Sequence, residues 1–263
     1  MDNIVFYFSG TGNSLKVAKT LGKELENTEI ISMARPGKYA LTKEYETIGF
    51  VYPTYFCGLP KKVIDFLENL DLGNNEDAYY YSIATHGGAA VNAVYQIYEL
   101  LHKRHGITMN YCQSLEMFPN YVPMYDMKQN VTEILKKSDE KLVPIITSIK
   151  NKENNKAKRL PIILYKIFEL YSKRFLRTVS NEDRNFTTGD NCTGCGICEK
   201  VCPVKNIEIT SGKPKFNHTC EQCLACIQYC PQKAINYKNK TQNRRRYTHP
   251  EIDYNEISRH NSL

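Results

Sequence analysis

Two runs of cysteines constrain this chain more than any other feature of its sequence. The runs cover residues 192–203 and 220–231, read CTGCGICEKVCP and CEQCLACIQYCP, and contain eight of the ten cysteines. In each run three cysteines stand at every third position, and a Cys-Pro pair follows after three further residues. This spacing is typical of [4Fe-4S] sites, because three thiolates on one tight loop can reach three corners of an iron–sulfur cube. The runs therefore predict two clusters and one-electron chemistry.

Structural zinc and a disulfide framework are the alternatives for these cysteines. Zinc sites usually separate two Cys-x2-Cys pairs by a longer loop. Disulfides require an oxidising compartment, and no charged n-region or cleavage site precedes the first apolar run. Gly194 and Gly196 fit a loop that bends around an inorganic core, and Pro203 and Pro231 fix the chain as it leaves each site. The cluster interpretation is therefore favoured, with a cytoplasmic location in an anaerobic or microaerobic host.

Both runs resemble those of two-cluster bacterial ferredoxins, which form a small α+β domain. The resemblance implies that the last cysteine of each run ligates the other cluster. One cluster would then be held by Cys192, Cys195, Cys198 and Cys230. The other would be held by Cys220, Cys223, Cys226 and Cys202.

The amino-terminal segment reads as a strand, a glycine-rich loop and a helix. Residues 4–8 are an apolar run, and apolar residues recur at helical spacing over 15–25. Backbone N–H groups at such a loop and helix start form an anion site. The loop lacks the Gly-Lys-Ser/Thr of a Walker motif and the G-x-G-x-x-G of a Rossmann fingerprint. Its candidate ligands are Ser9, Gly10, Thr11, Gly12, Asn13 and Ser14.

This loop resembles the phosphate loop of flavodoxins, and the resemblance implies bound FMN of low potential. The alternative is an ordinary glycine-rich turn. Further strands are predicted at 28–33, 47–52, 78–85 and 107–117, and helices at 59–70, 89–104 and 128–149, whereas 35–46 does not predict a helix. The fold class expected is α/β, with a flavodoxin-like doubly wound sheet of five parallel strands.

Loops after the later strands provide further flavin contacts by the same resemblance. The loop after the third strand offers Pro53, Thr54, Tyr55, Phe56, Cys57 and Gly58, with Cys57-Gly58 as the peptide that would turn its carbonyl toward the flavin. The next two loops offer Thr85, His86, Gly87, Gly88, Asn120 and Tyr121. Cys57 as a redox thiol and His86 as a proton donor are less favoured than a packing residue and a loop residue bonded to backbone. No catalytic residue is predicted.

Charge is unevenly distributed along the chain. Residues 1–149 carry 14 Lys and Arg against 17 Asp and Glu, whereas residues 150–178 carry nine against two and 238–263 carry six against three. The net charge of +7 therefore resides in a connector and a tail, and it does not indicate a nucleic-acid partner. No apolar run is long enough to span a bilayer.

The connector from Lys156 to Val179 predicts a basic amphipathic helix. Its apolar face either packs against the two domains, which is the favoured interpretation, or contacts an anionic membrane as a peripheral attachment. The tail motif at 244–250 either docks an acidic redox partner or folds back on the acidic amino-terminal half. The sequence does not decide the tail's role or the oligomeric state.

Taken whole, the chain resembles fused flavodoxin–ferredoxin proteins described as EFR-type family ferrodoxins of anaerobes. The resemblance covers the phosphate loop, the Pro-x-Tyr-x-x-Gly-Leu-Pro loop, both cysteine runs and the Arg-Tyr-x-His-Pro tail. It implies a flavodoxin-like domain (1–151), a connector (152–187), a ferredoxin domain (188–238) and a tail (239–263). The function implied is electron transfer between two [4Fe-4S] clusters, FMN and a redox partner protein. An FMN-dependent reductase and a flavin-free scaffold remain as alternatives.

Overall fold

Five parallel strands form the centre of the larger half of the molecule, in a computed structural model that describes residues 2–262 and side chains as far as Arg259. The strands are β1 (Asn3–Tyr7), β2 (Thr28–Ser32), β4 (Thr47–Pro53), β6 (Tyr79–His86) and β7 (Tyr111–Glu116). They lie in the order β2-β1-β4-β6-β7, and every neighbouring pair is parallel. This is the strand order of flavodoxin-like doubly wound folds. The predicted fold class is confirmed.

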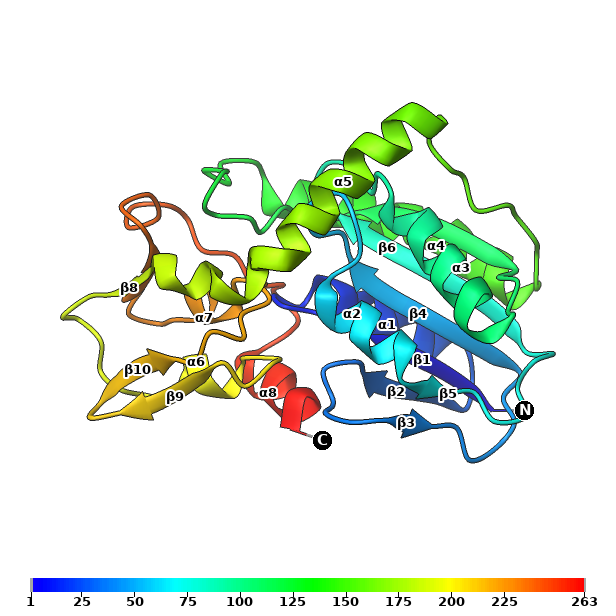
Figure 1. Ribbon diagram of the computed structural model, residues 1–263, viewed down its shortest axis with the longest axis horizontal. Coiled ribbons are helices and arrows are strands. Elements are labelled where there is room, and N and C mark those ends of the chain that lie inside the picture. Colours follow the sequence, from blue (N-terminus) through cyan, green and yellow to red (C-terminus); the bar gives the residue numbers. More distant parts are fainter. Residues whose placement is uncertain (1, 263) are drawn as a thin grey trace.

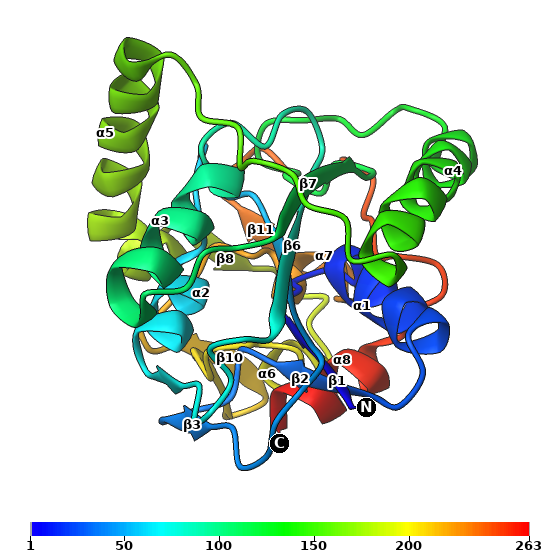
Figure 2. The ribbon, with the colours of Figure 1, turned by 90° about the vertical axis from the view of Figure 1, so that its right-hand side faces the viewer.

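Helices cover both faces of this sheet (Figure 2). The helices α1 (Asn13–Glu24) and α4 (Val131–Lys150) pack on one face, and α2 (Lys61–Glu68) and α3 (Ala93–His105) pack on the other. The central strands β1, β4 and β6 are buried nearly throughout, because helices cover both faces of the sheet. No helix joins β2 to β4; a short strand β3 (Tyr39–Ala40) pairs with β5 (Leu70–Asp71) there, as the broken pattern at 35–46 indicates.

The smaller half is built from short elements around the two cysteine runs. The strand β8 (Phe186–Thr188) pairs with β11 (Ile235–Tyr237), and β9 (Ile207–Thr210) forms a hairpin with β10 (Lys213–Phe216). Each run contributes a one-turn helix, α6 (Ile197–Lys200) and α7 (Ala225–Gln228). The core of this half includes Phe118, Val122 and Met127 from beyond β7. The two halves therefore share apolar contacts.

Two further helices join the halves (Figure 1). The helix α5 (Ile162–Thr178) runs over the top of the molecule from the sheet toward the smaller half and leads into the 3-10 helix η1 (Val179–Asn185). The helix α8 (Tyr254–Ser262) lies beside α1. In α5 only Tyr165 and Ser172 are fully buried. The favoured interpretation, that the apolar face of this helix packs inward, therefore holds for the side that carries these two residues and not for the apolar side chains that are exposed. Within residues 2–262, no helix combines the length and apolarity that crossing a membrane requires.

Candidate functional site

A cavity of about 300 Å³ opens at the carboxyl ends of the parallel strands. It lies where the loops after β1, β4, β6 and β7 converge, which is the usual ligand position in open α/β sheets. The predicted flavin residues on its wall are Ser9, Gly10, Thr11, Asn13, Ser14, Pro53, Thr54, Tyr55, Phe56, Cys57, Thr85, His86, Gly87, Gly88, Asn120 and Tyr121. Gly12 and Gly58 are the two predicted residues that do not line it.

The first loop owes its shape to Gly12, which precedes α1 with φ of 100°. The Gly12 N–H donates to Ser9 Oγ at 3.1 Å, which closes the loop on itself. A Cβ on Gly12 would lie 2.9 Å from the Cβ atoms of both His249 and Ile252. Gly12 therefore faces the carboxyl-terminal tail, while its neighbours face the cavity.

The loop after β4 turns sharply at two residues with positive φ, Phe56 (46°) and Cys57 (68°). The Cys57 carbonyl accepts a hydrogen bond from the Asn92 N–H at 3.2 Å, so it points toward the start of α3 rather than into the cavity. A Cβ on Gly58 would overlap the Ser172 hydroxyl of α5. In this structure the glycine serves the close approach of α5.

Several polar atoms on the cavity wall are buried and lack a hydrogen-bond partner among residues 2–259. They are Thr54 Oγ1, the Tyr55 hydroxyl, His86 Nδ1 and Gln222 Oε1. Such atoms are costly unless a ligand or water satisfies them. Burial lowers the pKa of His86 and raises that of Tyr55, so both side chains are uncharged near neutral pH. The wall thus suits a planar ligand that brings its own donors and acceptors, as FMN does.

The sequence analysis missed part of this wall. The additional lining residues are Ala89, Phe118, Pro119, Met124, Tyr125, Tyr171 and Gln222. Phe118 and Pro119 adjoin the predicted Asn120, so extending that loop by two residues would have found them. Tyr171 belongs to α5 and Gln222 to the second cysteine run, and neither carries a flavin-binding signal in the sequence.

The eight cysteines of the two runs surround two small cavities. One cavity is lined by Cys192, Cys195, Cys198 and Cys230, and the other by Cys202, Cys220, Cys223 and Cys226. These are the two groups that the ferredoxin resemblance implies, and we call them the first and second cysteine groups. Across the described residues, no three His, Cys, Asp or Glu side chains converge on a single metal ion. Four thiols lining one small cavity are the ligand set of a [4Fe-4S] cluster, in which each iron takes one thiolate.

Backbone amides point at the sulfur atoms. The N–H groups of Asn206, Gln222 and Ala234 donate to Cys202 Sγ (3.2 Å), Cys220 Sγ (3.1 Å) and Cys230 Sγ (3.3 Å), respectively. Hydrogen bonds of this kind stabilise negative charge on cluster ligands and tune their potential.

The two groups differ in exposure. All four cysteines of the second group are buried, whereas in the first group Cys195 is exposed and only Cys198 is fully buried. Burial raises the pKa of the Cys198 and Cys220 thiols to about 12. Thiols in this environment become thiolates only when a metal binds them.

The second cysteine group lies directly against the cavity at the carboxyl ends of the parallel strands. A Cβ on Gly10 would lie 2.7 Å from the Cys223 carbonyl oxygen and 3.1 Å from the Tyr55 hydroxyl. Only glycine permits this approach. Gln222, between Cys220 and Cys223, lies on the cavity wall. One loop of the smaller half thus forms part of the wall of the larger half.

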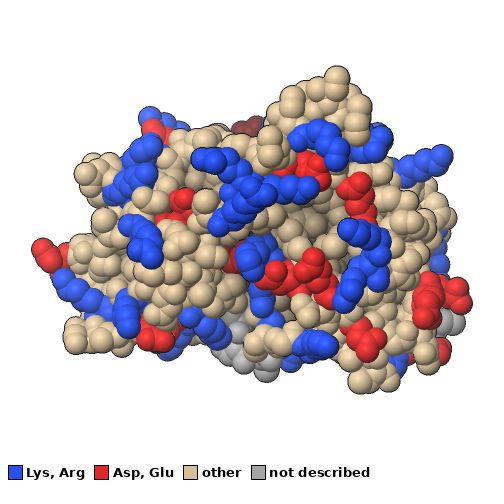
Figure 3. Space-filling model, in the orientation of Figure 1, with Lys and Arg blue, Asp and Glu red and all other residues tan. Residues whose placement is uncertain are grey.

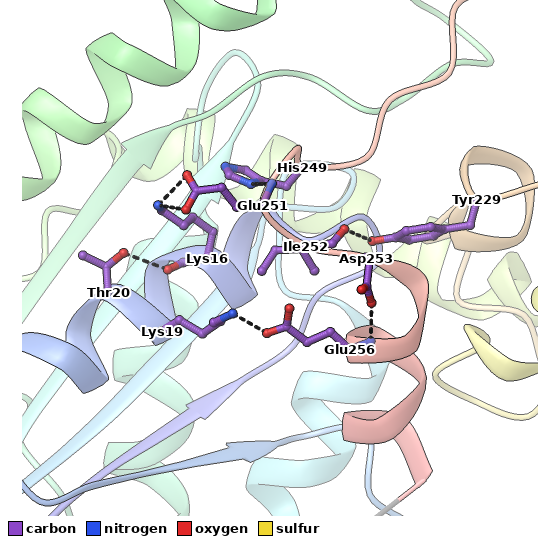
Figure 4. Close-up of polar contacts among 9 residues, drawn as sticks. All are labelled: Lys16, Lys19, Thr20, Tyr229, His249, Glu251, Ile252, Asp253 and Glu256. Atoms are coloured by element: carbon purple, nitrogen blue, oxygen red, sulfur yellow. Dashed lines mark hydrogen bonds and ion pairs between the residues drawn. The ribbon is translucent and has the colours of Figure 1, made fainter.

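The tail folds back over the first loop (Figure 4). The His249 N–H donates to the Thr11 carbonyl at 2.8 Å, and the Tyr247 hydroxyl donates to Asn13 Oδ1 at 2.6 Å. Lys16 and Lys19 of α1 pair with Glu251 (2.6 Å) and Glu256 (2.5 Å). Burial lowers the pKa of His249 to about 4, so the imidazole that packs on Gly12 is neutral.

The arginines of the tail are also held internally. Arg244 Nη1 donates to the Val122 carbonyl at 2.7 Å, and Arg246 Nη2 donates to Asn236 Oδ1 at 2.7 Å. Arg246 Nε and Nη1 are buried without a partner among the described residues, in the electrostatic reach of Cys226 and Cys230. Of the two alternatives for the tail, the structure shows the folded-back arrangement.

One known family matches the part of the chain that contains both cysteine runs. Residues 191–235 match the family described as a 4Fe-4S dicluster domain. A segment of 45 residues is 44% identical to one subunit of the ion-translocating oxidoreductase complex of Methanosarcina acetivorans. That match covers 17% of this chain and 17% of the relative, so the chain spans only a small part of that protein's length.

Solved structures resemble the amino-terminal part. Flavodoxin 1 from Bacillus cereus is 18% identical, covers 55% of this chain and 98% of its own, and has a TM-score of 0.37. An FMN-dependent NADH-azoreductase from Bacillus anthracis is 12% identical, covers 56% of this chain and 99% of its own, and has a TM-score of 0.39. The fold assignment rests on the strand order rather than on these likenesses. The chain thus joins an α/β domain with a flavodoxin-like strand order to a segment that matches a 4Fe-4S dicluster domain.

Proposed function

We propose that this chain carries single electrons between two [4Fe-4S] clusters and one FMN. The first and second cysteine groups would each hold a cluster, and the cavity at the sheet edge would hold the flavin. The observation that carries the proposal is the contact between Gly10 and Cys223, because it joins the phosphate loop to a cluster ligand with no side chain between them. The Methanosarcina relative is named as part of an oxidoreductase complex, which supports electron transfer for the matched segment.

The residues of the chain have distinct tasks in this proposal. When bound, FMN and the clusters supply the one-electron chemistry that protein side chains lack. The hydroxyl and amide groups of residues 9–14 would hold the phosphate without a formal positive charge, since the loop contains no Lys or Arg. Thr54, Tyr55, His86 and Gln222 would satisfy the polar edge of the ring with their free atoms.

The different exposure of the two cysteine groups suggests which cluster would exchange electrons with a partner and which with the flavin. The first group reaches the surface at Cys195, so it suits exchange with a redox partner protein. The second group is buried beside the cavity and suits exchange with the flavin. An ordered path within one chain keeps the flavin at a high effective concentration near its cluster.

An anaerobic redox titration followed by visible absorption and EPR tests this proposal. We expect one FMN and about eight iron atoms per chain, as two cubanes require. Gly10→Ala should slow electron exchange between cluster and flavin at least about tenfold, because the Cβ pushes the two loops apart. Gly22→Ala is the matched control, since its Cβ would crowd only side chains of β2, the nearest being Ile30 at 2.7 Å. Iron-free protein that ignores FMN would refute the proposal.

One observation favours a second candidate, an FMN-dependent reductase of a small organic acceptor. His86 Nδ1 is buried on the cavity wall with no partner among the described residues, so it could move a proton to or from a bound acceptor. Steady reduction of nitro, enone or quinone compounds that is lost in His86→Gln would support the reductase. Absence of turnover in the fully loaded protein would support the carrier.

A further inference from the structure

The outer face of α5 exposes more large apolar side chains than any other helix described here. Its exposed apolar residues are Ile162, Ile163, Leu164, Ile167, Leu170 and Tyr171. Ile163 and Leu170 are 72% and 70% exposed. The helix stands at the outer margin of the molecule (Figure 2). A contiguous apolar patch of this kind marks an interaction surface.

Positive charge accompanies this patch. The segment 150–178 has nine Lys and Arg against two acidic residues. Of the basic residues on α5, Lys166 and Lys173 pair with Glu169, whereas Arg174 and Arg177 form no ion pair with any described residue. At 100° per residue, Arg174 projects from the same side of the helix as Ile163 and Leu170. Figure 3 shows a crest of the molecule without charged side chains, with Lys and Arg gathered below it.

We propose that α5 docks this face on an anionic lipid surface. Apolar residues flanked by Lys and Arg on one exposed helix are typical of helices that lie in the membrane interface, where the apolar side chains enter the acyl boundary and the cations meet lipid phosphates. A twofold contact with a second copy would bring the same cations together, which disfavours self-association through this face. Charge complementarity therefore selects lipid.

Docking would also orient the cavity. Tyr171 of α5 lines it, and so do Met124 and Tyr125, which are 63% and 45% exposed. Phe175 stacks on Phe56 of the β4 loop with ring centroids 3.6 Å apart, so α5 is fixed to the cavity wall. The cavity mouth would therefore open at the edge of the lipid surface. This inference rests on surface residues and does not depend on the proposed electron transfer.

Vesicle flotation with the purified, cofactor-loaded protein tests the inference. We expect binding to vesicles of phosphatidylcholine with about 30% phosphatidylglycerol and at least about tenfold weaker binding to pure phosphatidylcholine, with loss at high salt. The double variant Ile163→Ser, Leu170→Ser should weaken binding at least about tenfold through lost apolar burial. The triple variant Lys173→Gln, Arg174→Gln, Arg177→Gln should do so through lost charge.

Control variants on α4 and the loop before it separate this effect from general surface changes. Val143→Ser removes an apolar side chain that is 63% exposed, and the triple change of Lys128, Lys136 and Lys137 to Gln removes three exposed cations. Both controls should bind anionic vesicles like the parent. Equal binding by all variants would overturn the inference, and so would a concentration-dependent dimer in sedimentation that the Ile163, Leu170 variant abolishes. Retained FMN and an unchanged circular dichroism spectrum show that each variant is folded.

Discussion

The loops at 192–198 and 220–226 share one cysteine spacing, and both need a positive φ at two matching positions. They fill these positions with different residues. The first loop has Gly194 and Gly196 at positive φ, 66° and 76°. The second loop has Gln222 and Leu224 in the matching places, at 49° and 64°. A side chain at such a φ costs about 1–2 kcal/mol relative to glycine. The second loop therefore accepts a strain that the first avoids.

The surroundings explain this difference. The first loop reaches the surface at Cys195, and Gly194 also permits a close approach, since a Cβ there would lie 2.7 Å from the Gly212 carbonyl oxygen. In the second loop Leu224 is 2% exposed in the core, and the Gln222 side chain reaches the cavity and donates to the Tyr121 hydroxyl at 3.3 Å. Strained residues persist where the surrounding contacts offset their cost. The second loop therefore forms part of the cavity wall at the sheet edge as well as holding its own cysteine group.

The two loops should differ most when each loses one cysteine. Cys195→Ser should lower the iron content from about eight to about four atoms per chain and leave FMN binding intact. Cys223→Ser should remove as much iron and also release FMN, because Cys223 backs the phosphate loop at Gly10. Iron and flavin analysis after anaerobic reconstitution measures both effects. Equal flavin retention in the two variants would contradict the distinction.

Acid should weaken the tail that fastens the cavity side. The pKa of His249 is about 4 in the folded protein and about 6.5 when unfolded, so between these values the unfolded state binds more protons. Stability should therefore fall as pH drops from about 6.5 to 4, by up to about 3 kcal/mol.

Denaturant unfolding at several pH values measures this contribution. His249→Gln should flatten the acid dependence, because it removes the buried imidazole. His102→Gln, on the exposed side of α3, provides a matched control that should retain the slope of the parent. An identical slope in all three proteins would exclude His249 as the source.

The smallest expected effect is that of replacing Gln222 in the second loop. Gln222→Gly should relieve about 1 kcal/mol of backbone strain while removing the side chain from the cavity. Stability without FMN should change little, because the lost hydrogen bonds to Tyr121 and Glu182 offset the relieved strain, and FMN affinity should fall several-fold. Leu224→Gly is the control, since it relieves the same kind of strain but empties the core instead of the cavity. A gain in FMN affinity on Gln222→Gly would show that the side chain serves only the loop.

The sequence predicted the parts of the molecule that carry local signals. Apolar strands and helical periodicity predicted the parallel sheet, and its strand order confirms the prediction. Glycine-rich and aromatic loops at strand ends predicted most of the cavity wall. Tyr171 and Gln222 could not be predicted as parts of the cavity wall, because packing between distant segments brings them there. The exposed face of α5 had the same amphipathic pattern as a packed helix, so only the structure separated the two.

The path of the tail sets an order of assembly. Residues 247–252, which close over the first loop, are synthesised after both cysteine runs. The amino-terminal half can form its sheet earlier, but its first loop lacks this cover until the segment with both cysteine runs has left the ribosome. In the proposed function, maturation of the iron centres and tight retention of the flavin would thereby be linked in time, with the flavin secured last.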